Sequence, residues 1–263
     1  MLRIAANLSM LFTERSFPER FGAAAEAGFT GVEFQFPYDY DKADLKRWLG
    51  DAGLEQVLIN MPAGDWQKGE RGTCCLPDRR QEFRAGIEQA AKYADALGCP
   101  RVHVIAGLMP QGANDRAPYR AIYCENLAYA ADRFAEHGIT ALIEPINGKR
   151  DAPGFFLQTT TEARAIIAEV GRPNLKLQFD AYHVQIMQGD LVHHFRDSLA
   201  DIGHMQIANP PERHEPDDGE INYPYFLRVV EDSGYDGWIG CEYRPRGDTV
   251  AGLGWARPYG IGG

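Results

Sequence analysis

The sequence predicts an α/β fold: a (β/α)8 TIM barrel in a single domain that spans residues 1–263. Three observations support this prediction. The chain has 263 residues, close to the roughly 250 typical of such barrels. Short apolar segments alternate with helical patterns along the whole chain. Glycine follows six of the helical patterns, where the end of a helix favours a left-handed residue.

Eight segments have the composition of buried strands, and seven segments between them have helical periodicity. Thr159 and Glu162 have the spacing of a capping box at the start of the fifth helix. Strands are expected over residues 2–8, 31–36, 56–60, 101–106, 140–144, 175–180, 202–208 and 237–242. Helices are expected over residues 18–27, 41–52, 79–97, 118–137, 160–170, 191–199 and 223–233. This alternation favours parallel strands closed into a barrel.

Two loops and the C-terminal segment stand out from this regular pattern. The loops over residues 61–78 and 107–118 are long, and long ordered loops that follow barrel strands are often functional. The tail over residues 244–263 is rich in glycine but contains Trp255 and Tyr259. We expect it to pack on the barrel or at a subunit contact, with a frayed terminus as the alternative.

Charge and cysteine content exclude several classes of partner. The formal net charge of −10 disfavours binding to nucleic acid and to anionic membranes. A small anionic substrate would need a local cationic pocket. The five cysteines are odd in number and include no Cys-x-x-Cys pair, which favours free thiols in a reducing cytoplasm. No signal peptide is recognisable, and no apolar run approaches the ~20 residues of a membrane span.

Four successive strands end in a side chain that can bind a metal. These residues are Glu144, Asp180, Gln206 and Glu242, in the fifth to eighth strands. Burying such groups is costly unless they are paired or ligated, and the C-terminal ends of barrel strands are where active sites form. The all-oxygen set predicts a divalent cation, Mg²⁺ or Mn²⁺. The alternative is that each residue caps a loop or pairs with a nearby arginine or lysine.

The strand-end residues also indicate a class of reaction. A divalent ion can hold a carbonyl oxygen and a neighbouring hydroxyl together, and a carboxylate beside it can move a proton between the two carbons. Glu144 and Glu242 come from non-adjacent strands, so they can face each other across a substrate. One would remove a proton and the other would return it. This chemistry is aldose–ketose isomerisation or epimerisation through an enediolate.

Further residues are candidates for contacts with the substrate. The main candidates are His183, Arg213, Lys149, His103 and Asn60. For the two histidines, a plain structural role is the alternative. Other residues that could hold an acid or line the pocket are Arg150, Lys68, Arg71, Glu33 and Asn7. The chain has no phosphate-binding glycine motif that opens a helix, so no nucleotide cofactor is expected.

Several segments resemble a known family. They cover residues 59–66 with 69–72, 144–150, 179–183, and 213–216 with 219–223. They are similar to the hydroxypyruvate isomerase and 2-oxo-tetronate isomerase group of the xylose-isomerase-like TIM-barrel family, and the resemblance spans nearly the whole chain. It implies an intramolecular oxidoreductase that interconverts hydroxypyruvate and tartronate semialdehyde, or performs the homologous 2-oxo-tetronate reaction, on a small anionic 2-oxo-3-hydroxy acid.

The resemblance also implies roles for the strand-end residues. Glu144 and Glu242 match the proton donor and acceptor, and Asp180 and Gln206 match the other ligand positions. Many sugar epimerases of the wider family carry histidine where this chain has Gln206. Because an amide binds a cation more weakly, the metal is either loosely held or of little importance to the reaction. A homo-oligomer is compatible with the sequence.

Three other functions are compatible with such a barrel. One is a ketose 3-epimerase of the same fold. Another is a metal-dependent nuclease similar to the endonuclease IV group, which the net charge of −10 and the scarcity of clustered histidines oppose. The third is a binding barrel without catalytic activity, which the four polar strand ends oppose. The sequence leaves open the length of the acid, the metal, the oligomeric state and the identity of the base.

Overall fold

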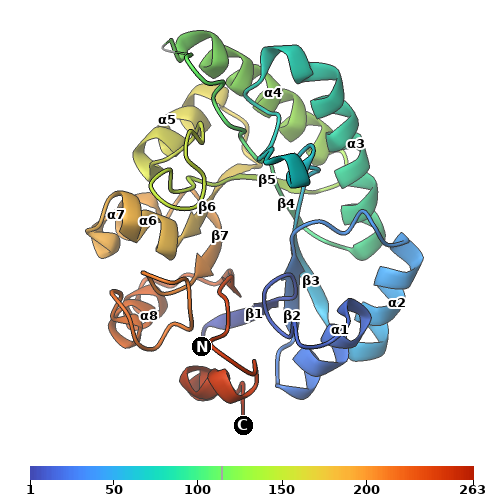
Figure 1. The fold of residues 1–263 in the computed structure, drawn as a ribbon, viewed down its shortest axis with the longest axis vertical. Helices are drawn as coiled ribbons and strands as arrows, with labels where there is room; N and C mark the ends of the chain where they lie inside the picture. Colours follow the sequence, from blue (N-terminus) through green and yellow to red (C-terminus); the bar gives the residue numbers. More distant parts are fainter. Residues whose placement is uncertain (114) are drawn as a thin grey trace.

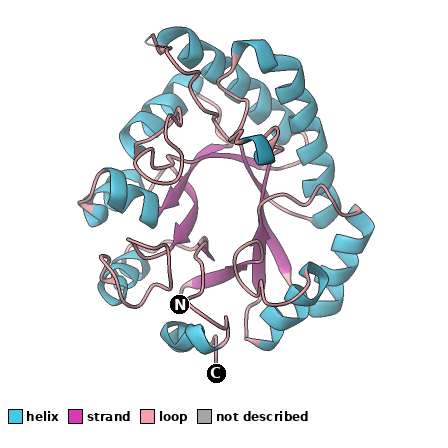
Figure 2. Cartoon of the chain, in the orientation of Figure 1, coloured by secondary structure: helices cyan, strands magenta, loops and turns pink. Residues whose placement is uncertain are grey.

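The computed structural model describes residues 1–113 and 115–263, which form a closed barrel of eight parallel strands (Figures 1 and 2). Each strand pairs with the next, and β8 closes the barrel on β1. The predicted fold is confirmed, and every strand lies within three residues of its expected bounds. The strands are β1 Arg3–Asn7, β2 Gly31–Phe34, β3 Glu55–Asn60, β4 Arg101–His103, β5 Thr140–Ile143, β6 Leu175–Asp180, β7 Ile202–Ile207 and β8 Trp238–Cys241.

The expected helices surround the barrel in Figure 2. Thr159 caps α5 by accepting a hydrogen bond from the backbone of Glu162 at 3.2 Å, whereas the Glu162 carboxylate bonds to Arg116. Among the described residues, no helix is long and apolar enough to cross a membrane. The expected helices are α1 Phe17–Glu26, α2 Lys42–Ala52, α3 Arg80–Leu97, α4 Ala117–Ala135, α5 Thr160–Val170, α7 Leu191–Ser198 and α8 Tyr223–Asp232.

Four short helices were not predicted. α6, over Ala181–Met187, begins directly at the end of β6, where Asp180 Oδ1 accepts a hydrogen bond from the backbone of Tyr182 at 2.8 Å. Its first four residues are all buried, so no amphipathic period marks it in the sequence. The others are the 3₁₀ helices η1 Trp66–Lys68, η2 Pro77–Arg79 and η3 Ala251–Tyr259. The first two lie in the long loop after β3. The loop expected over 107–118 includes residue 114, which lies outside the described residues.

The C-terminal tail packs on the barrel near its N-terminal strand (Figure 1). Leu253 and Ala256 of η3 are buried. The backbone N–H of Gly262 donates to the carbonyl of Ala27 at 2.8 Å, just after α1. These tertiary contacts stabilise a helix in a glycine-rich segment whose own propensity is low.

A layer of polar side chains fills the barrel interior. The Glu33 carboxylate accepts hydrogen bonds from Asn7 at 2.8 Å and Gln206 at 2.7 Å, and pairs with His204 at 2.7 Å. Gln178 donates to the amide oxygen of Gln206 at 2.6 Å. Because β2 and β7 are not neighbouring strands, the bonds from Glu33 to His204 and Gln206 cross the inside of the barrel. All five side chains are buried, so these partners offset the cost of removing the carboxylate from water.

Gly240 of β8 leaves the space that Glu33 occupies. A Cβ atom at this position would lie 2.3 Å from Glu33 Oε2. We expect Gly240→Ala to reduce the free energy of unfolding by about 2 kcal/mol, because the buried carboxylate has no room to move. The matched control is Gly22→Ala in α1, where a Cβ meets nothing within 4 Å. This change should stabilise the protein by about 0.5–1 kcal/mol through helix propensity. Urea denaturation measures both, and equal stability of the two variants would contradict the explanation.

Candidate active site

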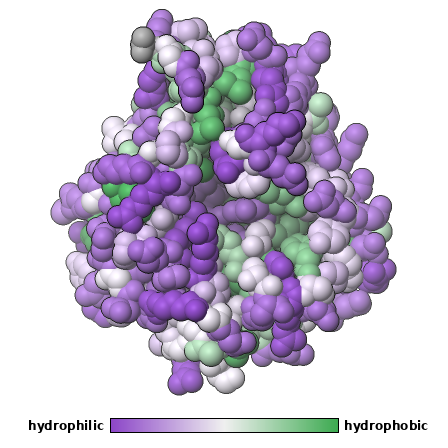
Figure 3. Space-filling model, viewed as in Figure 1, coloured by the Kyte–Doolittle hydropathy of each residue, from purple (hydrophilic) through white to green (hydrophobic). Residues whose placement is uncertain are grey.

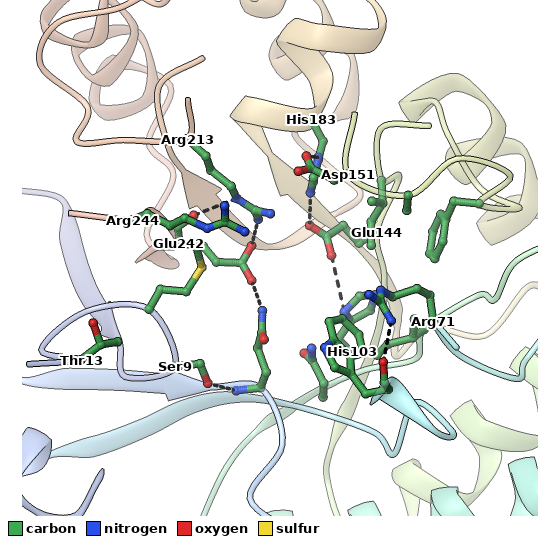
Figure 4. A pocket seen from close by; sticks show the side chains of 18 of the residues that line it. Ser9, Thr13, Arg71, His103, Glu144, Asp151, His183, Arg213, Glu242 and Arg244 are labelled. Atoms are coloured by element: carbon green, nitrogen blue, oxygen red, sulfur yellow. Dashed lines mark hydrogen bonds and ion pairs between the residues drawn. The ribbon is translucent and has the colours of Figure 1, made fainter. Parts of the chain in front are cut away.

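A cavity of about 600 Å³ lies among residues from the C-terminal ends of the strands and the loops that follow them. Figure 3 shows a hollow at the centre of the face in that view, and Figure 4 shows the cavity at close range. Its lining includes most of the residues that the sequence singles out for chemistry or substrate binding. Those that bear on the chemistry are Gln35, Asn60, His103, Glu144, His183, Arg213 and Glu242.

Glu144 and Glu242 face the cavity from different sides (Figure 4). Glu144 follows β5 and Glu242 follows β8, and these strands are not adjacent. The Glu242 carboxylate accepts hydrogen bonds from Gln35 at 2.8 Å and from Arg213 Nη2 at 2.6 Å. Glu144 Oε2 lies 3.5 Å from His103 Nδ1, and burial lowers the pKa of His103 to about 3, so this ring is neutral. Glu144 Oε1 has no hydrogen-bond partner in the described chain. The two carboxyl groups therefore have unequal surroundings.

These surroundings give the two carboxyl groups different affinities for a proton. Burial raises the pKa of Glu144 well above its ordinary range, and the charges of Glu242 and Asp180 raise it further. Burial also raises the pKa of Glu242, but Arg213 and the hydrogen bond from Gln35 oppose that rise. Glu144 therefore holds a proton more strongly than Glu242 does. Such a split is typical of catalytic carboxyl pairs.

Arg213 is the cation of this cluster. Its backbone has a φ of 62°, a left-handed conformation that costs a non-glycine residue on the order of 1 kcal/mol. Its Nη2 lies 3.5 Å from Asp180 Oδ2 as well as 2.6 Å from Glu242, and its guanidinium lies 4.9 Å from the centre of the Tyr182 ring. The positive charge of Arg213 therefore offsets the negative charge of the Glu242 and Asp180 carboxylates.

Glu144, Asp180 and His183 have the arrangement of a metal-binding group. Their candidate ligand atoms lie within 4.8 Å of one another, and all three residues are buried. Glu144 Oε1 and Asp180 Oδ2 are buried oxygens without a hydrogen-bond partner in the described chain. Two such oxygens fit a hard divalent cation.

Asn147 determines how His183 presents its ring. The Asn147 amide oxygen accepts the backbone N–H groups of Arg150 at 2.9 Å and Asp151 at 3.1 Å, and this fixes the orientation of the amide. Its NH₂ group therefore faces His183 Nδ1, at 2.7 Å, and makes that nitrogen the acceptor. Burial lowers the pKa of His183 well below its ordinary range, so the ring is neutral. A neutral ring with an unprotonated Nδ1 carries its hydrogen on Nε2.

The direction of that N–H bond matters for the site. His183 Nε2 lies 3.6 Å from Asp180 Oδ2 and 3.8 Å from Glu144 Oε1. In this tautomer His183 offers a hydrogen-bond donor to the cavity and has no lone pair on Nε2 for a metal. The two carboxylates therefore fit a cation better than the histidine does.

Comparison with known proteins places this chain in a family. The family model of the xylose isomerase-like TIM barrel matches residues 21–259. The chain belongs to this family. It is 55% identical to the 2-oxo-tetronate isomerase of Cupriavidus necator, over 98% of this chain and 99% of that protein. It is 50% identical to the hydroxypyruvate isomerase of Escherichia coli, over 98% of this chain and 100% of that protein.

A solved structure is similar along its full length. It is a crystal structure of a family 2 AP endonuclease from Brucella melitensis, with a TM-score of 0.95 and 50% sequence identity. The match covers 98% of this chain and 99% of that one. The resemblance to the xylose isomerase-like family, seen first in the sequence motifs, is confirmed.

Within this xylose isomerase-like barrel, three predicted residues are not among those described as lining the cavity: Lys149, Asp180 and Gln206. Asp180 contacts residues of the lining, with its Oδ2 atom 3.5 Å from Arg213 Nη2 and 3.6 Å from His183 Nε2. Lys149 is exposed, and its Nζ donates to the carbonyl of Ile186 at 2.7 Å. Gln206 belongs to the polar layer with Glu33, where both ends of its amide are hydrogen-bonded. The carbonyl oxygen of Gln206 keeps a second lone pair, so its role as a metal ligand stays a prediction.

Sequence reasoning missed three residues of the site. Gln35 follows β2 and bonds to Glu242. Asn147 orients His183, and Asp151 accepts the second N–H of the Asn147 amide. Gln35 could have been found in the sequence because it directly follows a strand, as Glu144 does. Asn147 and Asp151 lie in an irregular loop, where no periodicity reveals which side chains turn inward.

The tautomer of His183 can be reversed by one substitution. Asn147→Asp replaces the NH₂ donor with an acceptor, which favours a proton on Nδ1 and removes it from Nε2. We expect kcat of the isomerase reaction to fall about 10²-fold or more, because the cavity loses its donor. The ring nitrogen shifts of ¹⁵N-labelled His183, assigned against a His183→Gln variant, should report the change of tautomer. Unchanged nitrogen shifts in Asn147→Asp would show that Asn147 does not control the ring.

The buried Asp180 should make stability depend on pH. Burial raises the pKa of Asp180 to about 7, whereas an unfolded aspartate titrates near pH ~3.9. Between these values the unfolded state gains stability by ionising, so the folded state is increasingly penalised as pH rises. Asp180→Asn removes the penalty and keeps an oxygen to cap α6. Its stability gain should be on the order of 2 kcal/mol larger at pH 8 than at pH 4, in EDTA, by thermal denaturation. A gain that is the same at both values would refute the assignment.

Proposed function

We propose that the protein is a cytoplasmic isomerase that interconverts hydroxypyruvate and tartronate semialdehyde, or the homologous 2-oxo-tetronate pair, through an enediolate. The observation that carries this proposal is the pair of buried glutamates with unequal surroundings on different sides of one cavity. Relatives named for these two activities, at 50% and 55% identity over nearly the whole chain, support it.

We infer the proton route from the unequal surroundings of the two glutamates, with Glu242 as the ionised base and Glu144 as the acid. In the forward direction, ionised Glu242 removes a proton from C3 of hydroxypyruvate, and the negative charge moves to the oxygen on C2. The Nε2–H of His183 donates a hydrogen bond to that oxygen and stabilises the enediolate. Protonated Glu144 then delivers its proton to C2. The proton of the C3 hydroxyl is transferred to the oxygen on C2, which leaves an aldehyde at C3. Proton exchange with water restores Glu144 and Glu242.

We further propose a loosely held divalent cation, Mg²⁺ or Mn²⁺, on Glu144 and Asp180, with Glu242 nearby. The two unpartnered oxygens of the first two residues support such a site. When bound, the ion would polarise the substrate oxygens as a Lewis acid. Because a cation on Glu144 would also lower the pKa of that residue and remove its proton, we expect a weak dependence on metal. EDTA should reduce the rate by less than about tenfold.

The primary test is a comparison of substrates. The protein is incubated with hydroxypyruvate, with its four-carbon homologue and with free ketohexoses, with and without EDTA, and products are followed by NMR. We expect turnover of the acids. Turnover of the sugars alone would replace the proposal with ketose epimerisation. A duplex with an abasic site is a further arm, because the similar Brucella protein is described as an endonuclease. Strand cleavage without isomerisation of either acid would overturn the proposal.

Substitution of each glutamate separates the two proton transfers. Both Glu144→Gln and Glu242→Gln should lower kcat about 10²–10⁴-fold. In D₂O, the Glu144→Gln variant keeps the base, so hydroxypyruvate should still exchange its C3 hydrogens without forming the aldehyde. The Glu242→Gln variant should lose exchange and isomerisation together. Glu26→Gln, at an exposed position of α1, is the matched control. Full activity of either site variant would refute the proton-transfer roles.

The location and the assembly stay predictions. The five cysteines are all free thiols, as a reducing cytoplasm favours. A homo-oligomer is compatible with the sequence, and light scattering in solution would establish the mass.

A further inference from the structure

We propose that Arg71, in the loop between β3 and α3, binds the carboxylate of the substrate and so selects small oxo acids over neutral sugars. This inference rests on the proposed function and identifies what gives the site its substrate class. Arg71 lines the same cavity as Glu144 and Glu242. An acid that enters a cavity with several carboxyl groups needs a cation whose charge is not already balanced.

The cavity lining contains three arginines among its described residues: Arg71, Arg213 and Arg244. Arg213 is committed to Glu242 and Asp180. Neither of the others has a carboxylate within ion-pair distance in the described chain. The side chain of Arg244 is exposed and makes no hydrogen bond to described residues, so its position is weakly fixed. Arg71 is half-buried, and its Nη1 donates to the carbonyls of Trp66 at 3.2 Å and Glu70 at 2.7 Å.

Trp66 orients the guanidinium of Arg71. The Arg71 Cζ atom lies 3.7 Å from the centre of the indole ring, and the ring itself packs on Phe36 at 5.1 Å between centroids. Stacking on an aromatic face leaves the edge of a guanidinium, with its N–H donors, available to a carboxylate. Trp66 also lines the cavity, so the stacked pair forms one part of its wall.

Glu70, the neighbour of Arg71 in the sequence, pairs with Arg79 and does not neutralise Arg71. The carboxylate of Glu70 binds Arg79 through two hydrogen bonds, at 2.9 and 3.0 Å, and accepts the backbone N–H of Asp65 at 2.6 Å. The hydrogen bonds from Arg79 and the backbone of Asp65 lower the pKa of Glu70 to about 2, so its charge is held by Arg79 at neutral pH. Arg71 therefore keeps an unbalanced positive charge.

The glycine that follows Arg71 fixes the loop against the barrel. Gly72 has a φ of 100°, and a Cβ on it would lie 2.5 Å from the carbonyl oxygen of Ile105, beyond the end of β4. Its N–H donates to the carbonyl of Ala63 at 2.8 Å, and Gly72 forms a β-bridge with Ala106. A close backbone approach of this kind requires glycine. It holds the loop in a defined position next to the cavity.

The position of Arg71 agrees with the proposed proton route. In Figure 4, Arg71 lies on the side of the cavity where His103 and Glu144 are found, while Glu242 and Arg213 lie on the other side. A carboxylate at Arg71 places C2, the next carbon, toward Glu144 and C3 toward Glu242. This arrangement agrees with the proposed roles, in which Glu242 accepts a proton from C3 and Glu144 donates one to C2.

The experiment measures kcat and KM of Arg71→Gln on hydroxypyruvate and on dihydroxyacetone, in which a neutral CH₂OH group replaces the carboxylate. We expect kcat/KM for hydroxypyruvate to fall about 100-fold, mainly through KM, and Arg71→Lys to recover part of the loss. The value for dihydroxyacetone should change by less than about threefold. The control is Arg47→Gln, which removes an exposed arginine of α2 that pairs with Asp44 and does not line the cavity. Equal losses on both substrates, or a loss confined to Arg244→Gln, would overturn the proposal.

A binding measurement separates this inference from the proposed function. D-Glycerate has the carboxylate but no carbonyl group to isomerise, and glycerol is its neutral control. We expect glycerate to change the fluorescence of Trp66 in the wild-type protein, with at least about tenfold weaker binding in Arg71→Gln. Arg71-dependent binding without turnover of any oxo acid would refute the proposed function and support the carboxylate site. Turnover of hydroxypyruvate that is unaffected by Arg71→Gln would refute the carboxylate site alone.

Discussion

The site depends on one buried ion cluster in which Arg213 balances carboxylates from different strands. The barrel brings Glu144, Asp180 and Glu242 together at one rim, and burial makes each of them costly to ionise. Arg213 contacts Glu242 and Asp180 but is not in ion-pair contact with Glu144. This asymmetry is the origin of the difference between the glutamates. Without it, two similar carboxyl groups would titrate as an equivalent pair and neither would be a defined acid or base.

The polar layer beneath the rim gives that cluster a rigid base. Glu33 accepts hydrogen bonds from Asn7 and Gln206 and pairs with His204, which offsets the cost of burying its carboxylate. The amide nitrogen of Gln206 donates a hydrogen bond to Glu33, and its amide oxygen accepts one from Gln178. Gln206 therefore connects opposite sides of the barrel next to the strand-end carboxylates.

The sequence predicts the barrel and the strand-end carboxylates well because both depend on local pattern and register. Parallel pairing places Asp180 opposite Gln206, and this places the strand ends of β6 and β7 at the same rim. Loop residues behave differently. Lys149 and Asn147 are two positions apart, yet Asn147 turns to His183 while Lys149 turns to the surface. No periodicity governs such a choice, because it is determined by hydrogen bonds that form only in the folded loop.

In our proposals, proton transfer depends on residues at strand ends, whereas the choice of substrate depends on a loop. The glutamates that we propose to move protons are placed by barrel register, whereas Arg71 lies in a loop that glycines and the Glu70–Arg79 pair hold in place. A change in that loop can alter which molecule enters without displacing Glu144 or Glu242. The Glu70–Arg79 ion pair has to persist, however, because a Glu70 released from Arg79 would lie next to Arg71 and balance its charge. If Arg71 selects an acid as we propose, the selection therefore also depends on Arg79, which pairs with Glu70.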